Sequence, residues 1–301
     1  MSSREIAVPV PGGSLAAIDY GGTGRDVLFA HSPGFNARQW DEVAELVSTR
    51  CVSIDLPGHG HSTAPVIPGD EIWRYLVEVI DHLGLKQPLI VSHEMSGAVT
   101  LQAGRQAPER IGGLMFINGS CACSREAMVT AHALWNGTEL RELLKSRFSL
   151  ELPVPAPDAQ TYLRDLAEKI SGDWWLPEDV PLPTPVLERS MFDHHDGTYS
   201  LRPATPDISV FYSFEDTPLF PCADAFDGLE LQAWLVANEG TFEPSSWSDI
   251  EALALRHSNV HARFLPGGHY PQHSTPHVIA RLVDEAVAEL DAAATGGRAA
   301  G

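Results

Sequence analysis

Apolar residues along this chain follow two alternating patterns. Short runs of β-branched and aliphatic residues, typical of buried strands, are separated by longer stretches with helical spacing. Glu71–Leu83 shows the helical spacing most clearly, because its apolar residues recur every three or four positions and the segment stops at Gly84. Strands and helices that alternate in this way predict an α/β fold with a mostly parallel sheet.

Eight apolar runs predict the strands of this sheet. The first two are separated by Pro-Gly-Gly, which predicts a hairpin at the start of the chain. The others alternate with helices, as parallel strands joined by crossover connections require. The expected strands are Ile6–Pro11, Leu15–Tyr20, Asp26–Ala30, Cys51–Asp55, Gln87–Ser92, Ile111–Asn118, Leu231–Asn238 and Ala262–Leu265. The expected helices are Glu71–Leu83, Gly97–Ala107 and Pro276–Leu290, which flank the sheet.

The alternation breaks after the sixth expected strand. Residues 121–228 are rich in proline and carry helical patches at Ser124–Leu134 and Asp158–Ile170, so we expect them to form a largely helical cap inserted over the sheet. The α/β core then comprises residues 1–120 and 229–290. Residues 291–301 are rich in Ala and Gly, and we expect a disordered tail there.

The charge balance argues against a nucleic-acid partner. The 301 residues include 20 Lys and Arg against 40 Asp and Glu, a formal net charge of -20, whereas phosphate binding needs a basic surface. No apolar run reaches the roughly 18 residues of a membrane helix, and the first residues do not resemble a secretory signal. We expect a cytoplasmic protein that binds a small molecule and neither nucleic acid nor membrane, as a monomer or homodimer.

Cysteine and histidine spacing indicates neither a disulfide framework nor a metal site. The four cysteines are few and scattered for a chain of this length. Pairs such as His194-His195 occur without an HExxH pattern or a Cys/His array. We therefore expect buried free thiols, no metal and no cofactor.

The segment Leu89–Ala98 predicts a strand, a sharp turn and a helix. Such a nucleophile elbow needs small residues two before and two after its centre, because strand and helix approach closely there. Glu94 satisfies this rule, with Ser92 and Ser96 on either side. A centre at Ser96 would put the Glu94 side chain where only a small residue fits, so the sequence places Glu94 at the tip of the elbow.

Four motifs in this order resemble the α/β-hydrolase superfamily over nearly the whole chain. They are the elbow Ser92–Gly97, the oxyanion-loop segment His31–Trp40, the turn Asp55–Ser62 and the loop Pro266–His269. The resemblance implies an α/β-hydrolase fold with a cap, Glu94 in the place of the nucleophile and His269 as the catalytic histidine. The carboxylate-nucleophile branch, with epoxide hydrolases and haloalkane dehalogenases, is the nearest in chemistry.

Three positions depart from the family pattern. Glu94 replaces the usual Ser or Asp, and Pro33 stands where a backbone N–H normally points into the oxyanion hole, although proline has none. The Met95 N–H remains available. The position of the acid that orients the histidine holds Thr241, so Glu239, Glu243 or the strand-end Asn118 are the alternatives. The expected pocket is lined by Ser32, Pro33, Gly34, Met95, the cap residues Trp174 and Trp175, and Tyr212.

These residues leave three hypotheses for function. In the first, Glu94 attacks an epoxide carbon of a small or medium apolar or aromatic substrate, His269 activates the water that cleaves the ester, and Tyr162, Tyr199 or Tyr212 donates to the epoxide oxygen. A dehalogenase is less well matched, because Pro33 and Met95 occupy the usual halide-binding positions. In the second, Glu94 and His269 act as general acid and base in a lyase, cyclase or rearrangement reaction. In the third, the chain binds a ligand without catalysis.

Overall fold

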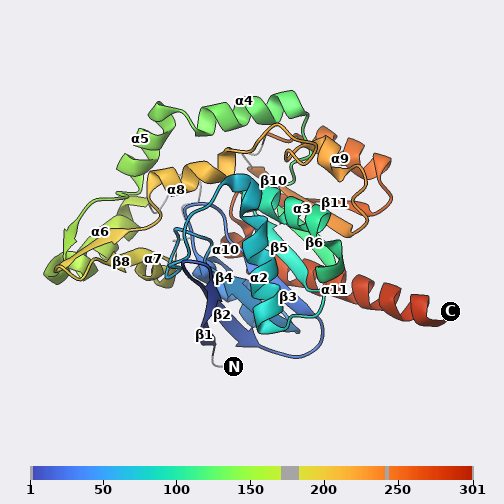
Figure 1. The fold of residues 1–301 in the computed structure, drawn as a ribbon, viewed down its shortest axis with the longest axis horizontal. Helices are drawn as coiled ribbons and strands as arrows, with labels where there is room; N and C mark the ends of the chain where they lie inside the picture. Colours follow the sequence, from blue (N-terminus) through green and yellow to red (C-terminus); the bar gives the residue numbers. More distant parts are fainter. Residues whose placement is uncertain (1–2, 171–182, 241–243, 300–301) are drawn as a thin grey trace.

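A mixed sheet of eight strands forms the centre of the molecule (Figure 1). The computed structural model describes residues 3–170, 183–240 and 244–299. The strand order is β1-β2-β4-β3-β5-β6-β10-β11. Strand β2 pairs antiparallel with β1 and β4, and the other neighbouring pairs are parallel. The strands are β1 Arg4–Val10, β2 Gly13–Gly21, β3 Asp26–Ala30, β4 Arg50–Ile54, β5 Leu89–His93, β6 Gly113–Ile117, β10 Gln232–Gly240 and β11 Val260–Gly268.

The expected eight-stranded, mostly parallel sheet is confirmed. All eight apolar runs form strands, with bounds that differ from the expected ones by at most three residues. The pattern is informative because the central strands are covered on both faces. Every residue of β3 and β5 is buried, and strands in that position consist of nearly continuous apolar runs.

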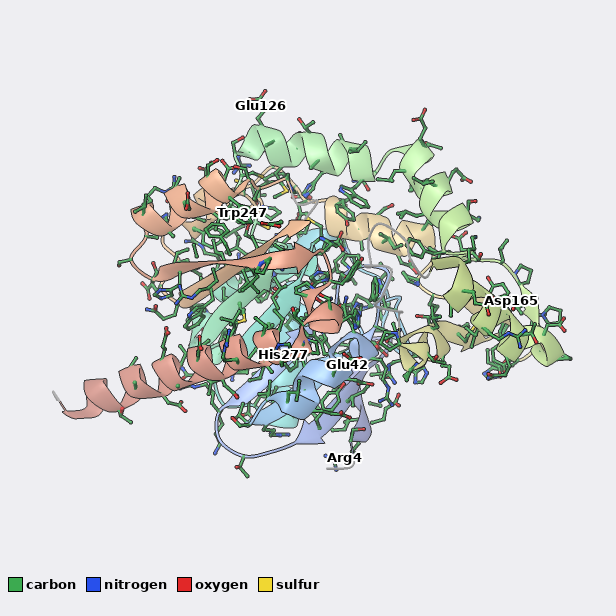
Figure 2. All side chains as sticks on the ribbon, turned by 180° about the vertical axis from the view of Figure 1, so that it is seen from behind. Arg4, Glu42, Glu126, Asp165, Trp247 and His277 are labelled. Atoms are coloured by element: carbon green, nitrogen blue, oxygen red, sulfur yellow. The ribbon has the colours of Figure 1, made fainter. Side chains whose placement is uncertain are left out.

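Helices cover both faces of the sheet and create two hydrophobic cores. Alternate residues of a strand point to opposite faces, so Leu28 contributes to one core whereas Val27 and Phe29 contribute to the other. Figure 2 shows the second face, with Glu42 and His277 on its two neighbouring helices. The first face carries α2 Trp73–Leu83, α3 Ser96–Gln106 and α9 Trp247–Arg256; the second carries α1 Asp41–Leu46, α10 Pro271–Ser274 and α11 Pro276–Ala299.

Between β6 and β10, the described residues form α4 to α8 and a small sheet outside the core. Figure 1 shows α4, α5 and α6 as an arch beside the main sheet. The helices are α4 Arg125–Trp135, α5 Thr138–Arg147, α6 Ala159–Ile170, α7 Thr184–Ser190 and α8 Thr205–Ser209. The antiparallel sheet has the order β7 Val154–Pro155, β9 Thr198–Leu201, β8 Met191–Asp193. We call residues 121–228 the cap segment.

Short 3-10 helices complete the described structure. They are η1 Ala37–Trp40, η2 Gly69–Glu71, η3 Pro108–Arg110, η4 Ala156–Asp158, η5 Val210–Tyr212 and η6 Ala223–Phe226. Within the described ranges, no helix has both the length and the apolar character needed to cross a membrane.

The end of the chain differs from the expected disordered tail. Helix α11 continues past Leu290 as far as Ala299. The reason lies in its composition, because a run rich in alanine has high helix propensity despite its two glycines. An ion pair between Arg25 and Asp291, 2.8 Å long, also fixes the helix to the core at that point.

Candidate active site

The elbow between β5 and α3 is centred on Glu94. This residue has φ = +56°, a strained left-handed conformation for a residue with a side chain. A Cβ on Gly97 would lie 2.1 Å from the Gly119 carbonyl oxygen, and a Cβ on Gly119 would lie 1.9 Å from that of Glu94. The elbow therefore leaves no room for a side chain at Gly97 or Gly119.

Glu94 lines two cavities. The larger contains about 730 Å³ of space not filled by atoms, including the part open to solvent, and its walls are mostly apolar. The smaller, of about 330 Å³, is bordered by Met95, Cys121 and Trp135. A side chain in this position can reach a bound molecule from either space.

Tyr212 of the cap segment donates a hydrogen bond to Glu94. The phenolic oxygen lies 3.3 Å from Glu94 Oε1, and the Tyr212 ring stacks on Trp135 with 4.9 Å between centroids and 8° between planes. Burial raises the pKa of Glu94 to about 8, although the hydrogen bond from Tyr212 acts in the opposite direction. Near neutral pH the carboxyl group is therefore mostly protonated.

The loop after β3 has few donors to offer an oxyanion. The Ser32 N–H donates to Gln39 Oε1 at 2.9 Å, Pro33 has no N–H, and the Gly34 N–H donates to His59 Nε2 at 3.0 Å. In the part of the chain that the structure describes, this leaves the Met95 N–H as the donor beside Glu94. The loop thus lacks a free N–H at Ser32 and Gly34 as well as at Pro33.

Two buried histidines, both in the neutral form, hold this loop in place through hydrogen bonds. His59 Nδ1–H donates to the Pro57 carbonyl at 2.9 Å while Nε2 accepts from Gly34. His31 Nδ1–H donates to the Ser32 carbonyl at 2.7 Å while Nε2 accepts from Leu56 N–H. Burial lowers the pKa of both rings to about 3. These side chains are structural supports of the loop.

His269 lies at the end of β11, and its main chain is tied to the elbow. The His269 carbonyl oxygen accepts from His93 Nε2 at 2.9 Å and from Asn118 Nδ2 at 2.8 Å. The Asn118 oxygen accepts from the Asn238 N–H. Asn118 was one of the alternatives for orienting the imidazole. It positions the backbone instead, because both the nitrogen and the oxygen of its side-chain amide form hydrogen bonds with backbone groups.

The His269 ring is buried next to the elbow. Only 2% of the residue is exposed, and the ring centroid lies 5.1 Å from that of His93 and 4.9 Å from that of Tyr270. Burial, with His93 as a smaller influence, lowers the pKa of His269 well below its usual value. Between described residues, the hydrogen bond to the Glu94 carboxylate comes from Tyr212 and not from His269. The pairing of Glu94 with His269 stays a prediction.

The other expected site residues are distributed unevenly. Pro33, Gly34 and Tyr212 line the larger cavity and Met95 the smaller one. Ser32 is buried beneath the loop, and Glu239 is exposed at the end of β10. Trp174, Trp175 and Glu243 lie outside the described residues. Of the three candidate tyrosines, Tyr162 donates to the Ser149 carbonyl and Tyr199 lies on β9, so Tyr212 is the one that meets Glu94.

Most residues that line the larger cavity were not anticipated from the sequence. Three of them bear on the chemistry of the site, namely Trp135, Arg202 and Tyr270. Tyr270 directly follows His269, and this adjacency was an available signal. Trp135 directly follows the expected helical patch Ser124–Leu134, but nothing in that pattern shows that its ring supports Tyr212. Arg202 follows a short strand in the cap segment and carries no motif that marks it.

Sequence comparison relates the chain to esterases and dehalogenases. Residues 27–282 match the model of the alpha/beta hydrolase family. An esterase of Mycobacterium tuberculosis is 28% identical over 160 residues, which cover 49% of this chain and 52% of the esterase. A haloalkane dehalogenase of Mesorhizobium japonicum is 28% identical over 119 residues, 38% of each protein. The chain thus spans about half the length of the first relative and less of the second.

Solved structures show the same fold over almost the whole chain. E-2-(acetamidomethylene)succinate hydrolase has a TM-score of 0.70 at 14% identity, with 94% of this chain and 98% of that chain covered. The M. tuberculosis esterase has a TM-score of 0.69 at 20% identity, with 95% and 92% covered. The family match runs from β3 into α11, and so includes the elbow, the loop after β3 and His269. The chain therefore belongs to the alpha/beta hydrolase family.

Proposed function

We propose that this chain is a cofactor-independent hydrolase that opens an epoxide of a small or medium apolar substrate through a covalent ester on Glu94. The observation that carries the proposal is the Glu94 carboxyl group at the tip of the elbow, facing a mostly apolar cavity, with the Tyr212 hydroxyl 3.3 Å away. The nucleophile and a proton donor for the departing oxygen then lie side by side.

The first step forms the ester. An ionised Glu94 oxygen attacks an epoxide carbon, the carbon–oxygen bond of the ring breaks, and its electron pair passes to the ring oxygen, which takes the Tyr212 proton. Attack at an sp³ carbon creates no tetrahedral oxyanion. The scarcity of N–H donors in the loop after β3 therefore carries no penalty at this step. The dehalogenase relative is named for haloalkanes, whose reacting carbon is also sp³.

The second step cleaves the ester and restores the site. His269 takes a proton from water, the hydroxide attacks the carbonyl carbon of the Glu94 ester, and the Met95 N–H donates to the oxyanion that forms there. The bond between the carbonyl carbon and the bridging oxygen breaks, and this oxygen, which Glu94 supplied, leaves with the diol and receives the proton from His269. Glu94 then returns its acid proton to the Tyr212 oxygen, so that one epoxide and one water give one diol. Burial lowers the pKa of His269, so the ring is unprotonated and can accept this proton.

A second candidate function rests on the protonation state of Glu94. A pKa of about 8 leaves the carboxyl group mostly protonated at pH 7, which suits a general acid in a non-hydrolytic lyase, cyclase or rearrangement reaction. In that case no ester forms, and the missing oxyanion donors have no consequence at any step.

Labelling with oxygen-18 separates the two candidates. The enzyme, in molar excess over an aryl epoxide, is taken through one turnover in labelled water, and the peptide containing Glu94 is analysed by mass spectrometry. We expect the label in Glu94 and unlabelled diol, because water attacks the ester carbonyl. Label in the diol after the first turnover would exclude the ester, and label in neither would exclude hydrolysis. The His269→Ala variant should accumulate the ester as a mass adduct, whereas Glu94→Gln should form none.

A further inference from the structure

One residue that lines the larger cavity together with Glu94 is an arginine. Arg202, just after β9, is one of the residues that line it. Its guanidinium carbon lies 3.5 Å from the centroid of the Phe192 ring, and its Nη1 donates to the Ser62 carbonyl at 2.8 Å. The head group is thus held in one place by an aromatic ring on one side and a backbone carbonyl on the other.

Arg202 has no carboxylate partner among the described residues. No described Asp or Glu lies within 4.0 Å of its nitrogens, whereas Arg189 contacts both Asp55 and Glu5. A guanidinium group has five N–H donors, and the hydrogen bond to Ser62 uses one of them. Burial lowers the pKa of Arg202, although Asp207 and Asp55 oppose that effect. The remaining donors are suited to an oxyanion supplied by a ligand.

Arg202 and Glu94 have different partners. Among the described residues, the Arg202 guanidinium donates to Ser62, whereas the Glu94 carboxyl group accepts from Tyr212. Apolar side chains such as Leu187, Leu201 and Ile208 supply most of the remaining wall. The cavity therefore offers an apolar interior with an acid at one position and a cation at another. Because Arg202 is a single cation and lies close to Asp207, we expect it to favour a ligand with one negative charge over a ligand with two.

We infer that the larger cavity binds molecules with an apolar body and one carboxylate, and that Arg202 recognises the carboxylate. The planar fork of a guanidinium matches the two carboxylate oxygens. If the proposed function holds, the substrate class narrows to epoxides that carry a carboxylate away from the ring. The inference rests on the proposed function for the reaction, but the binding site itself can be tested without turnover.

The test compares two ligands with the same apolar body, one with a carboxylate and one with an uncharged hydroxyl group. Phenylbutyrate and phenylbutanol are titrated into the full-length protein by isothermal calorimetry. We expect the acid to bind more tightly, and Arg202→Gln to weaken binding of the acid by about 10- to 100-fold, the range for a hydrogen bond to a charged group. The same change should leave the affinity for the alcohol almost unaltered. Arg202→Lys, which keeps the charge, should retain part of the preference even where the Gln variant folds poorly.

Arg74 provides a matched control. It is an exposed arginine whose guanidinium lies over the Trp73 ring, 5.4 Å from the centroid, outside the cavity. Arg74→Gln removes the same charge and should leave both affinities unchanged. Equal affinity for the two ligands, no binding at millimolar concentration, or an undiminished preference in Arg202→Gln would overturn the inference. If the protein prefers the acid in calorimetry but Glu94 gains no oxygen-18 in the single-turnover experiment, the proposed reaction is wrong and the binding site is supported.

Discussion

At the scale of single residues, Glu94 shows how far the sequence determines the site. Ser92 and Ser96 on either side were enough to place it at the elbow, and φ = +56° agrees. Its pKa could not be predicted, because the shift depends on burial and on Tyr212, a residue 118 positions away. The orientation of His269 was equally hidden, since Asn118 and His93 hold its carbonyl group through contacts between distant strands.

The role of Glu94 can be determined from the pH dependence of kcat/KM. A nucleophile must be ionised, so below its pKa of about 8 the rate should rise about tenfold per pH unit and level off above it. A general acid must be protonated, and the rate should then fall above pH 8. Neighbouring groups do not obscure the change, because burial moves the pKa of Tyr212 up and that of His269 down.

Tyr212→Phe serves as the control for that profile. The hydrogen bond from Tyr212 lowers the Glu94 pKa, and its removal should shift the midpoint of the profile to higher pH. A profile that is flat between pH 6 and 9 in the unaltered protein would contradict both catalytic roles of Glu94.

At the scale of elements, the sequence predicted the strands of the main sheet and missed the strands of the small sheet and some of the helices. The strands of the small sheet contain two to four residues, too few for a periodic pattern. Helix α9 was missed despite a capping box, in which Ser246 and Asp249 bond each other's backbone N–H groups. The close packing of the elbow against Gly119 was also invisible, because that residue follows a different strand.

Gly119→Ala should damage both stability and activity. The added Cβ would lie 1.9 Å from the Glu94 carbonyl oxygen, so the elbow must move, at a cost of about 1–3 kcal/mol in the free energy of unfolding. A displacement near 1 Å at the reacting group should lower kcat/KM by about 100-fold. Chemical denaturation and initial rates measure the two effects.

Gly84→Ala is the matched glycine control. Gly84 has φ = +62° at the end of α2, and a Cβ added there would meet nothing within 4 Å. Its replacement should cost about 1 kcal/mol through backbone strain alone and leave kcat/KM unchanged. Equal losses of kcat/KM in Gly119→Ala and Gly84→Ala would mean that displacement of the elbow does not cause the loss of activity.

At the scale of the whole molecule, a buried ion pair joins the cap segment to the core. Arg189 of α7 contacts Asp55, at the end of β4, with a closest distance of 2.9 Å, and also Glu5 of β1. The side chains of Arg189 and Asp55 are 3% and 0% exposed. The sequence did not reveal this connection, because the partners are 134 positions apart.

Arg189→Met should destabilise the protein by about 3–5 kcal/mol, because it leaves the Asp55 charge buried without its partner. Urea denaturation measures this loss. The exposed pair of Arg110 and Asp81, at 2.9 Å, is the reference, and Arg110→Met should cost less than about 1 kcal/mol. A loss for Arg189→Met no greater than that of the reference would show that other contacts hold the cap segment in place.

The position of Glu94 between two unequal spaces has a stereochemical consequence. A substrate carbon that reacts with the Glu94 carboxylate can extend its bulkier substituent into the space of about 730 Å³ and its smaller substituent into the space of about 330 Å³. In the mirror-image substrate, the bulkier substituent would have to enter the smaller space. From a racemic mixture, the protein should consume one enantiomer and leave the other behind.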